Sequence, residues 1–454
     1  MKFFFLLIFL QILLFTTFAQ FSISPNKHFI LRDGKPFFWL GDTGWELFHS
    51  LNRDEADYYL KRITEQGVTV IQAVVLAEFD GLHIPNANGD LPLNFDDPAK
   101  PNEKYFEQVD YIIDKASSVG LTIALLPTWG DKIYKDGWGK GPDFFTPLNA
   151  NKHGKWIGDR YKNKKNIIWI LGGDRNLRAG TNDIEIWRAM AAGVEEGVGG
   201  QDKALMSFHP QGVPEGASQW FHNDSWFDFN MFQTGHCTDQ PVYDKIGTSY
   251  NRLPAKLVID GEPIYENIPI CFDEKEMGKS SAYDVRKAAY HSLFAGAFGH
   301  TYGCNDIWQM HTPIYEAVLG SNLFYKDAME LNGANQMKFA RRLLESRPFL
   351  ERVPDQSLIV ENNLFAGERI QATHGTDYAF IYSAQGRSIT VIMGKIYGTK
   401  IKAYWYNPRN GVTKAVGTFD NNGQQIFIAP TSGYSQDWVL ILDDESKNYA
   451  KLYY

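Results

Sequence analysis

Residues 68–76 read Val-Thr-Val-Ile-Gln-Ala-Val-Val-Leu, a nearly continuous run of β-branched and apolar side chains. Such a run is typical of a strand that is buried on both faces, as in a parallel sheet covered by helices. The segment before it predicts a helix, in which Asn52 and Glu55 form a capping pair and Gly67 marks the end. This succession of helix, glycine and buried strand predicts one unit of an alternating α/β fold.

The same alternation continues on both sides of this unit. We expect eight strands, at residues 37–40, 68–76, 121–126, 166–171, 204–208, 227–233, 256–260 and 299–302. Eight alternating repeats predict a parallel sheet closed into a (β/α)8 TIM barrel, which we place at residues 20–345. An open doubly wound sheet is the alternative, but no Gly-rich nucleotide-binding loop follows the first strand.

From about Ser346 the pattern changes to short strand-like runs without a helix between them. These runs are residues 380–382, 389–393, 400–406, 425–429 and 438–442. Turns rich in Asn and Gly separate several of them, and the spacing is typical of all-β domains. We therefore expect residues 346–454 to form a small all-β sandwich after the barrel.

The first residues have the pattern of a secretory signal peptide. Lys2 precedes an apolar run that ends near Phe18, and Ala19 supplies a small residue for cleavage. The run is short for a bilayer and contains Gln11, which argues against a membrane anchor. We expect residues 1–19 to be removed and the mature chain to be secreted or periplasmic, without a membrane span.

The composition excludes several classes of function. A net charge of −8 argues against nucleic acid as a partner, because phosphate binding needs a face rich in Lys and Arg. Three cysteines, Cys237, Cys271 and Cys304, allow one disulfide but no disulfide framework. No CxxC or HExxH spacing occurs, so we predict no metal site and no cofactor. Aromatic residues make up 15% of the chain, which favours carbohydrate binding because flat rings with a polar edge suit sugar faces.

Two carboxyl groups lie where expected strands end, which is the face at which barrel active sites form. Asp174 follows the strand at 166–171 after two glycines, and Glu262 follows the strand at 256–260 after Gly261. Glycosidic bond cleavage needs such a pair, one group to protonate the leaving oxygen and one to attack the anomeric carbon or activate water. We expect Asp174 to be the acid/base, because burial at the barrel mouth would raise its pKa, although it could instead cap the next helix. Glu262 is the expected nucleophile or base, with Glu266 as the alternative.

Other side chains at the strand ends could bind a sugar. The residues expected to contact substrate are Asp42, Trp45, Glu78, Trp129, His209, His236, Tyr302 and Trp308. For each of them, a buried structural hydrogen bond explains the residue equally well. As a set they would form a cup with polar walls and aromatic panels, which suits a saccharide. The loops at residues 80–101 and 130–147 are expected to decide which sugar fits.

Four motifs carry a resemblance to a known family. They are Phe-Trp-Leu-Gly-Asp-Thr-Gly-Trp at 38–45, Trp-Ile-Leu-Gly-Gly-Asp at 169–174, Asp-Gly-Glu-Pro-Ile-Tyr-Glu at 260–266 and Gly-His-Thr-Tyr-Gly at 299–303. In this order they resemble the apiosidase-like glycoside hydrolases, which are secreted bacterial enzymes. The resemblance covers nearly the whole mature chain and implies a (β/α)8 barrel followed by a β-domain of the collagen-binding type. It also implies an acid/base at Asp174 and a nucleophile within residues 260–266.

The resemblance implies release of apiose-linked side chains from the pectin rhamnogalacturonan II. The implied partner is therefore a plant cell-wall oligosaccharide or polysaccharide. Two alternatives stay open: a glycosidase of other specificity, such as a galactosidase or glucanase, and a non-catalytic secreted carbohydrate-binding protein. Gly173-Asp174 stands where the broader clan of retaining barrel glycosidases has Asn-Glu, so retention and inversion both stay open. The motif does not decide between Glu262 and Glu266.

Overall fold

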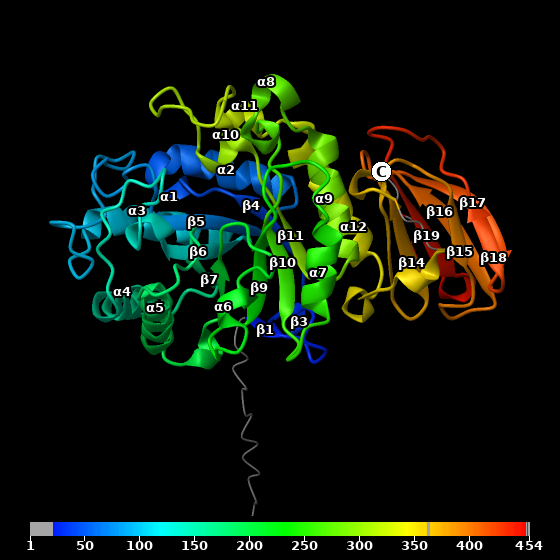
Figure 1. The fold of residues 1–454 in the computed structure, drawn as a ribbon, viewed down its shortest axis with the longest axis horizontal. Helices are drawn as coiled ribbons and strands as arrows, with labels where there is room; N and C mark the ends of the chain where they lie inside the picture. Colours follow the sequence, from blue (N-terminus) through cyan, green and yellow to red (C-terminus); the bar gives the residue numbers. More distant parts are fainter. Residues whose placement is uncertain (1–20, 361–363, 451, 453–454) are drawn as a thin grey trace, which may run out of the picture.

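Eight parallel strands form the centre of the N-terminal region in the computed structural model, which describes residues 21–360, 364–450 and 452. They are hydrogen-bonded in the order β8-β7-β6-β5-β4-β11-β10-β9 (Figure 1). Their bounds are β4 (Trp39–Thr43), β5 (Val70–Leu76), β6 (Thr122–Thr128), β7 (Ile167–Gly172), β8 (Met206–His209), β9 (Phe229–Gln233), β10 (Leu257–Glu262) and β11 (Gly299–Tyr302).

The two strands at the ends of this order close the sheet. The backbone N–H of Asp228, just before β9, donates to the carbonyl of Met206 in β8 at 2.9 Å. The hydroxyl of Ser207 in β8 donates to the carbonyl of Phe229 in β9 at 2.6 Å. The predicted (β/α)8 barrel is therefore confirmed, and each of its strands overlaps the expected one.

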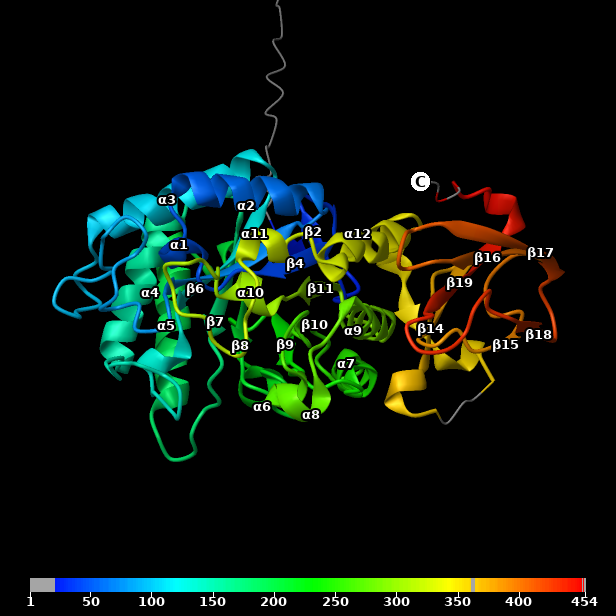
Figure 2. The same ribbon diagram turned by 90° about the horizontal axis from the view of Figure 1, so that it is seen from above.

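Helices surround the barrel (Figure 2). The longer helices are α2 (Arg53–Glu65), α3 (Glu103–Ser118), α4 (Pro147–Tyr161), α5 (Asp183–Val198), α7 (Val242–Tyr250), α9 (Ala282–Phe294) and α12 (Asn332–Glu345). Short helices lie in the connections: α1 (Leu47–Ser50), α6 (Ser218–Phe221), α8 (Glu274–Met277), α10 (Asn305–Trp308) and α11 (Tyr325–Ala328). Helix α2 begins as predicted, because the side chain of Asn52 accepts from the N–H of Glu55 and the Glu55 carboxylate accepts from the N–H of Asn52. This reciprocal cap satisfies donors that the start of a helix would otherwise leave unpaired.

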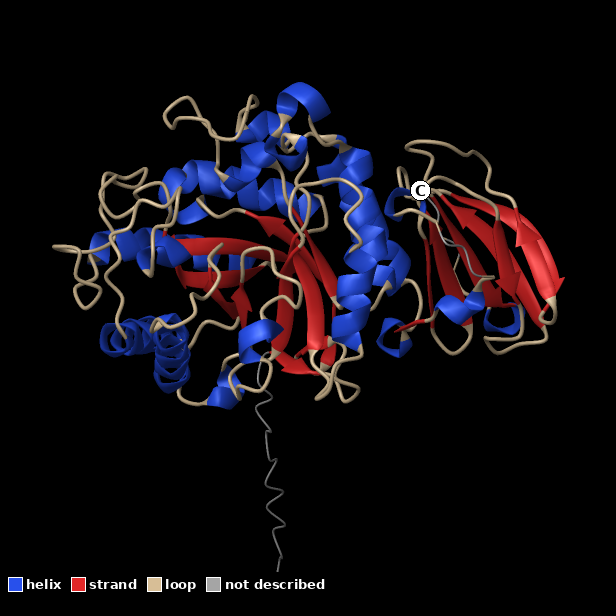
Figure 3. Cartoon of the chain, viewed as in Figure 1, coloured by secondary structure: helices blue, strands red, loops and turns tan. Residues whose placement is uncertain are grey.

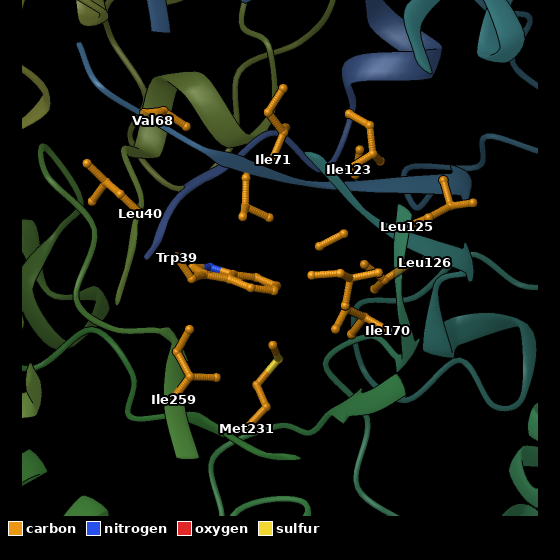
Figure 4. Close-up of a cluster of buried hydrophobic side chains, with 14 of the residues drawn as sticks. Trp39, Leu40, Val68, Ile71, Ile123, Leu125, Leu126, Ile170, Met231 and Ile259 are labelled. Atoms are coloured by element: carbon orange, nitrogen blue, oxygen red, sulfur yellow. The ribbon is translucent and has the colours of Figure 1, made fainter. Parts of the chain in front are cut away.

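Trp39 fills the interior of the barrel. Its ring lies among side chains from several strands, including Ile170, Met231 and Ile259 (Figure 4). It is completely buried, and its indole N–H donates to the hydroxyl of Thr301 in β11 at 3.0 Å. This tryptophan therefore has both its apolar surface and its polar atom satisfied inside the barrel.

A small sheet at the start of the described chain was not predicted. It pairs β1 (Phe21–Ile23), β2 (Ile30–Arg32) and β3 (Lys35–Phe37) in antiparallel fashion. The predicted signal peptide at residues 1–19 precedes this sheet and lies outside the described residues. Among the helices that the structure describes, none has both the length and the apolar composition to cross a bilayer.

The C-terminal region consists mainly of antiparallel strands (Figure 3). One sheet has the order β12-β13-β14-β19-β16-β17, and a second sheet pairs β15 with β18. The bounds are β12 (Val353–Pro354), β13 (Ile370–His374), β14 (Tyr378–Ser383), β15 (Ile389–Ile392), β16 (Lys400–Tyr406), β17 (Thr413–Asp420), β18 (Gln424–Phe427) and β19 (Trp438–Asp444). Side chains from both sheets, such as Phe427 and Leu440, share one core, so the expected all-β sandwich is confirmed. The sequence did not predict β12, β13 or β17.

Helices α9 and α12 lie between the barrel and the β-domain (Figures 1 and 2). Arg286 of α9 donates two hydrogen bonds to the carboxylate of Asp437, at 2.8 and 3.0 Å. Arg347, just after α12, binds Asp443 of β19 in the same two-pronged way, at 2.7 and 2.9 Å. All four side chains are almost completely buried. Because a buried charge is costly without its partner, these two pairs fix the β-domain against the barrel.

Replacing Trp39 with Ala should lower the apparent free energy of unfolding by about 3–5 kcal/mol, because a buried ring is lost and a cavity remains. Thermal unfolding followed by circular dichroism measures this loss. Leu148→Ala, at an exposed position of α4, is the control and should change stability by less than about 0.5 kcal/mol. Equal melting temperatures for the two variants would contradict the role given to Trp39.

Candidate active site

Glu262, the last residue of β10, lies between two imidazole rings at the carboxyl ends of the strands. Its Oε2 is 3.0 Å from Nε2 of His209, which ends β8, and its Oε1 is 3.3 Å from Nε2 of His236, in the loop after β9. The Glu262 side chain is only 7% exposed. Burial alone would raise its pKa, but the two histidines outweigh burial and hold the pKa well below its usual value. Glu262 is therefore an ionised carboxylate in a nearly dry environment.

Asp174 shares this end of the barrel, two residues after β7. Its side chain is 20% exposed, and its Oδ1 accepts a hydrogen bond from Nε2 of Gln233 at 2.8 Å. Gln233 ends β9 and stands opposite Glu262 in the pairing of β9 with β10. Burial, followed by the negative charge of Glu262, raises the pKa of Asp174 to about 7. The two carboxyl groups thus form a pair with opposite shifts, one ready to donate a proton near neutral pH and one ionised.

The two glycines before Asp174 allow the chain to turn at this place. Gly172 and Gly173 have φ values of +89° and +123°, which residues with a side chain rarely adopt. A Cβ atom at Gly172 would lie 2.3 Å from the carbonyl oxygen of His209, and one at Gly173 would lie 2.8 Å from the N–H of Gly130. The sharp turn predicted from these glycines is therefore confirmed.

Aromatic rings line the site beside the two carboxyl groups. The ring of Trp45 lies 5.2 Å from the ring of Trp129 and 5.2 Å from the imidazole of His209, measured between centroids. The ring of Tyr265 lies 4.5 Å from the imidazole of His236. The indole N–H of Trp129 is buried and has no partner among the described residues. The structure therefore brings Trp45, Trp129 and His209 into one cluster, which His236 joins through Glu262.

Glu266 has a different set of partners. It accepts hydrogen bonds from the hydroxyl of Tyr302 at 2.7 Å and from the backbone N–H groups of Gly333 and Ala334 at 3.0 and 3.3 Å. The last two donors belong to the first turn of α12, where a carboxylate is favoured by the unpaired N–H groups and the helix dipole. Glu266 thus holds the start of α12, and Tyr302 in turn binds Glu266.

The remaining predicted residues divide in the same way. Asp42 accepts a hydrogen bond of 2.5 Å from the hydroxyl of Tyr59 on α2, so it serves the packing of that helix. Glu78, after β5, is partly exposed, and burial followed by the charges of nearby carboxylates, including Asp174, raises its pKa well above the usual value. Trp308 on α10 packs against the ring of Phe79, 5.4 Å away. Asp42 is therefore occupied by a helix contact, whereas Glu78 lies among several carboxylates, Glu46 and Asp131 before Asp174.

The sequence did not predict several residues of the site. Gln233 and Tyr265 lay inside a predicted strand and a quoted motif, but nothing local to them revealed their contacts. A disulfide between Cys237 and Cys271 joins the loops that follow β9 and β10, and Cys304 is a free, buried thiol. In the described ranges, no group of three or more His, Cys, Asp or Glu side chains could hold a metal ion.

Two family models match the chain. Residues 24–351 match the model described as "Apiosidase-like, catalytic domain". Residues 353–443 match the model described as "Putative collagen-binding domain of a collagenase". The resemblance drawn from the four sequence motifs is therefore confirmed.

Two solved structures are similar over nearly the whole chain. One, named a glycoside hydrolase, is 36% identical, with 95% of this chain and 98% of that chain covered and a TM-score of 0.86. The other is a glycoside hydrolase family 5 protein from Bacteroides vulgatus ATCC 8482, which is 35% identical over 96% of each chain with a TM-score of 0.87. No curated protein matches the sequence.

Replacing Glu266 with Ala should lower the melting temperature, because a buried hydroxyl and two helix N–H groups lose their acceptor. Each buried donor left unsatisfied costs about 1–3 kcal/mol. Thermal unfolding by circular dichroism checks this, with Glu276→Ala on the exposed helix α8 as the control. If both variants have the same melting temperature as the wild-type protein, Glu266 does not anchor α12.

Proposed function

The chain belongs to the apiosidase-like glycoside hydrolases, and we propose that it releases apiosyl groups from the plant pectic polysaccharide rhamnogalacturonan II. The observation that carries the proposal is the pair of carboxyl groups, Asp174 and Glu262, whose pKa values shift in opposite directions. Such divergent environments assign the roles of acid and base in a two-carboxylate site. The choice of sugar is supported by the family to which residues 24–351 belong.

In the proposed reaction, Asp174 acts first as the general acid. Its protonated carboxyl group donates the proton to the glycosidic oxygen while the bond from that oxygen to the anomeric carbon breaks. The leaving group departs as a neutral alcohol. The raised pKa of Asp174 suits this step, since an acid works best when its pKa lies near the working pH.

Glu262 supplies the negative charge at the anomeric carbon. As a nucleophile it forms a glycosyl ester that water then cleaves, with Asp174 taking the proton from that water; as a base it activates water directly. Either role needs an ionised carboxylate, and His209 and His236 provide for it. The anomer of the first product, read by proton NMR, separates the two roles. Retention requires the glycosyl ester, whereas inversion requires direct attack by water on the substrate.

The enzyme is proposed to act outside the cytoplasm. Two observations support this location: the signal-like pattern of residues 1–19 and the disulfide between Cys237 and Cys271. Disulfides persist in oxidising compartments and are rare in the cytosol. A plant polysaccharide also reaches the enzyme only outside the cell.

A substrate screen tests the proposal. Protein lacking residues 1–19 is assayed against rhamnogalacturonan II fragments and a panel of aryl glycosides, and release of apiose is expected. Asp174→Asn and Glu262→Gln should each lower kcat/KM at least about 100-fold, because each removes a group that acts in the transition state. Glu266→Gln is the matched control and should keep most of the activity. Cleavage of galactosides or glucans alone would contradict the proposal that the released sugar is apiose. Full activity in both variants would contradict the two-carboxylate mechanism.

The pH profile of kcat/KM gives a second test. Activity should fall as the pH rises past about 7, because Asp174 must keep its proton to act as the acid. The hydrogen bond from Gln233 favours the ionised form of Asp174, so Gln233→Leu should raise the pKa and move this alkaline limb to higher pH. If Gln233→Leu leaves the alkaline limb in place or moves it to lower pH, the limb does not reflect the ionisation of Asp174.

A further inference from the structure

Arg175, directly after Asp174, ties the loop that follows β6 to the end of β7. Its Nη1 donates to the carbonyl of Asp174 at 2.8 Å, its Nη2 to the carbonyl of Lys135 at 2.8 Å and its Nε to the carbonyl of Tyr134 at 3.3 Å. The side chain is only 1% exposed, so its charge is compensated by these oriented carbonyls. The loop around residues 134–138 is therefore held directly beside Asp174.

The loop leaves room for this arginine at two glycines. A Cβ atom at Gly139 would lie 2.7 Å from Nη2 of Arg175, and one at Gly130 would lie 2.7 Å from Cγ of the same side chain. Side chains at these positions would push the guanidinium out of place. The path of the loop and the position of Arg175 thus depend on each other.

Trp138 lies at the tip of this loop with its ring over the guanidinium. The central carbon of the Arg175 guanidinium is 4.4 Å from the ring centroid, a cation–π contact that fixes the orientation of the ring. Trp138 nevertheless remains 49% exposed. The same guanidinium reaches the carboxyl group of Asp174, with Nη1 4.0 Å from Oδ2, so a fixed, open indole ring lies one guanidinium away from that carboxyl group.

We propose that Trp138 is the platform on which the first sugar of the leaving group stacks. The inference rests on the proposed function, in which Asp174 gives its proton to the glycosidic oxygen. A proton donor must come within hydrogen-bond distance of that oxygen, so the sugar attached to it lies against the surroundings of Asp174. The ligand class is a pyranose, whose face of C–H groups packs on an aromatic ring while its hydroxyls stay in water.

A second exposed ring lies beside His236. Phe272 is 61% exposed, and its ring lies 5.5 Å from the imidazole of His236, which contacts Glu262. Phe272 therefore lies beside a partner of Glu262, whereas Trp138 lies beside Arg175 and Asp174. Phe272 and Trp138 therefore offer a matched pair of exposed aromatic residues for an experiment.

The test compares two substrates with the same released sugar. One is an apiosyl oligosaccharide from rhamnogalacturonan II, and the other is apiosyl fluoride, whose leaving group has no ring to stack. Trp138→Leu, which keeps an apolar cover on Arg175, should lower kcat/KM roughly tenfold on the oligosaccharide and leave the fluoride unchanged. Trp138→Phe, which keeps a ring, should recover most of the activity on the oligosaccharide. Phe272→Ala should not show the same split between the two substrates.

Binding gives a readout that does not depend on turnover. Calorimetry measures the affinity of the oligosaccharide without its apiosyl group for the Glu262→Gln protein, and Trp138→Leu in that background should weaken it roughly tenfold. Equal losses on both substrates, or no loss on the oligosaccharide, would overturn the proposal. Failure of the proposed sugar is distinguishable, because the wild-type protein would then cleave neither apiosyl substrate. In that case the oligosaccharide and the glycosyl fluoride are prepared with the sugar that the screen identifies.

Discussion

Two carboxyl groups share the mouth of one barrel, and the protein places imidazole rings against only one of them. His209 and His236 both face Glu262, whereas Asp174 has a neutral amide from Gln233 and a more distant arginine. Two neighbouring carboxylates cannot both ionise readily in a nearly dry site. The negative charge therefore settles on Glu262, and that charge itself helps to keep the proton on Asp174. The chemistry of the site depends on this division.

The closed barrel makes the division possible. Asp174, His209, Gln233 and Glu262 stand at or just beyond the ends of four successive strands, from β7 to β10. The parallel arrangement places all these ends on one face of the barrel, although the residues span almost ninety positions of the sequence. Trp39 is completely buried and packs with the side chains of these strands in the barrel interior.

The segment from Glu262 to Glu266 connects the site with the rest of the molecule. Glu262 faces the histidines, whereas Glu266 receives the first turn of α12, four residues later. Helix α12 and its neighbour α9 are the elements on which the β-domain rests, through Arg286 with Asp437 and Arg347 with Asp443. The β-domain thus supports the helix that Glu266 anchors, which gives it a structural part independent of any ligand of its own.

The sequence alone determined the alternation of strands and helices, the barrel, the all-β domain and the identity of Asp174 and Glu262 as candidates. Those features follow from the burial pattern of consecutive residues and from polar groups at strand ends, which are local signals. The sequence did not predict strand β17 because most of its residues are exposed and show no apolar alternation. It did not predict β1 to β3 because each is only three residues long. Only the tertiary structure separated Glu262 from Glu266, since their partners lie 26 to 68 positions away along the chain. A carboxyl group takes its role from the charges and donors around it, and folding decides which groups those are.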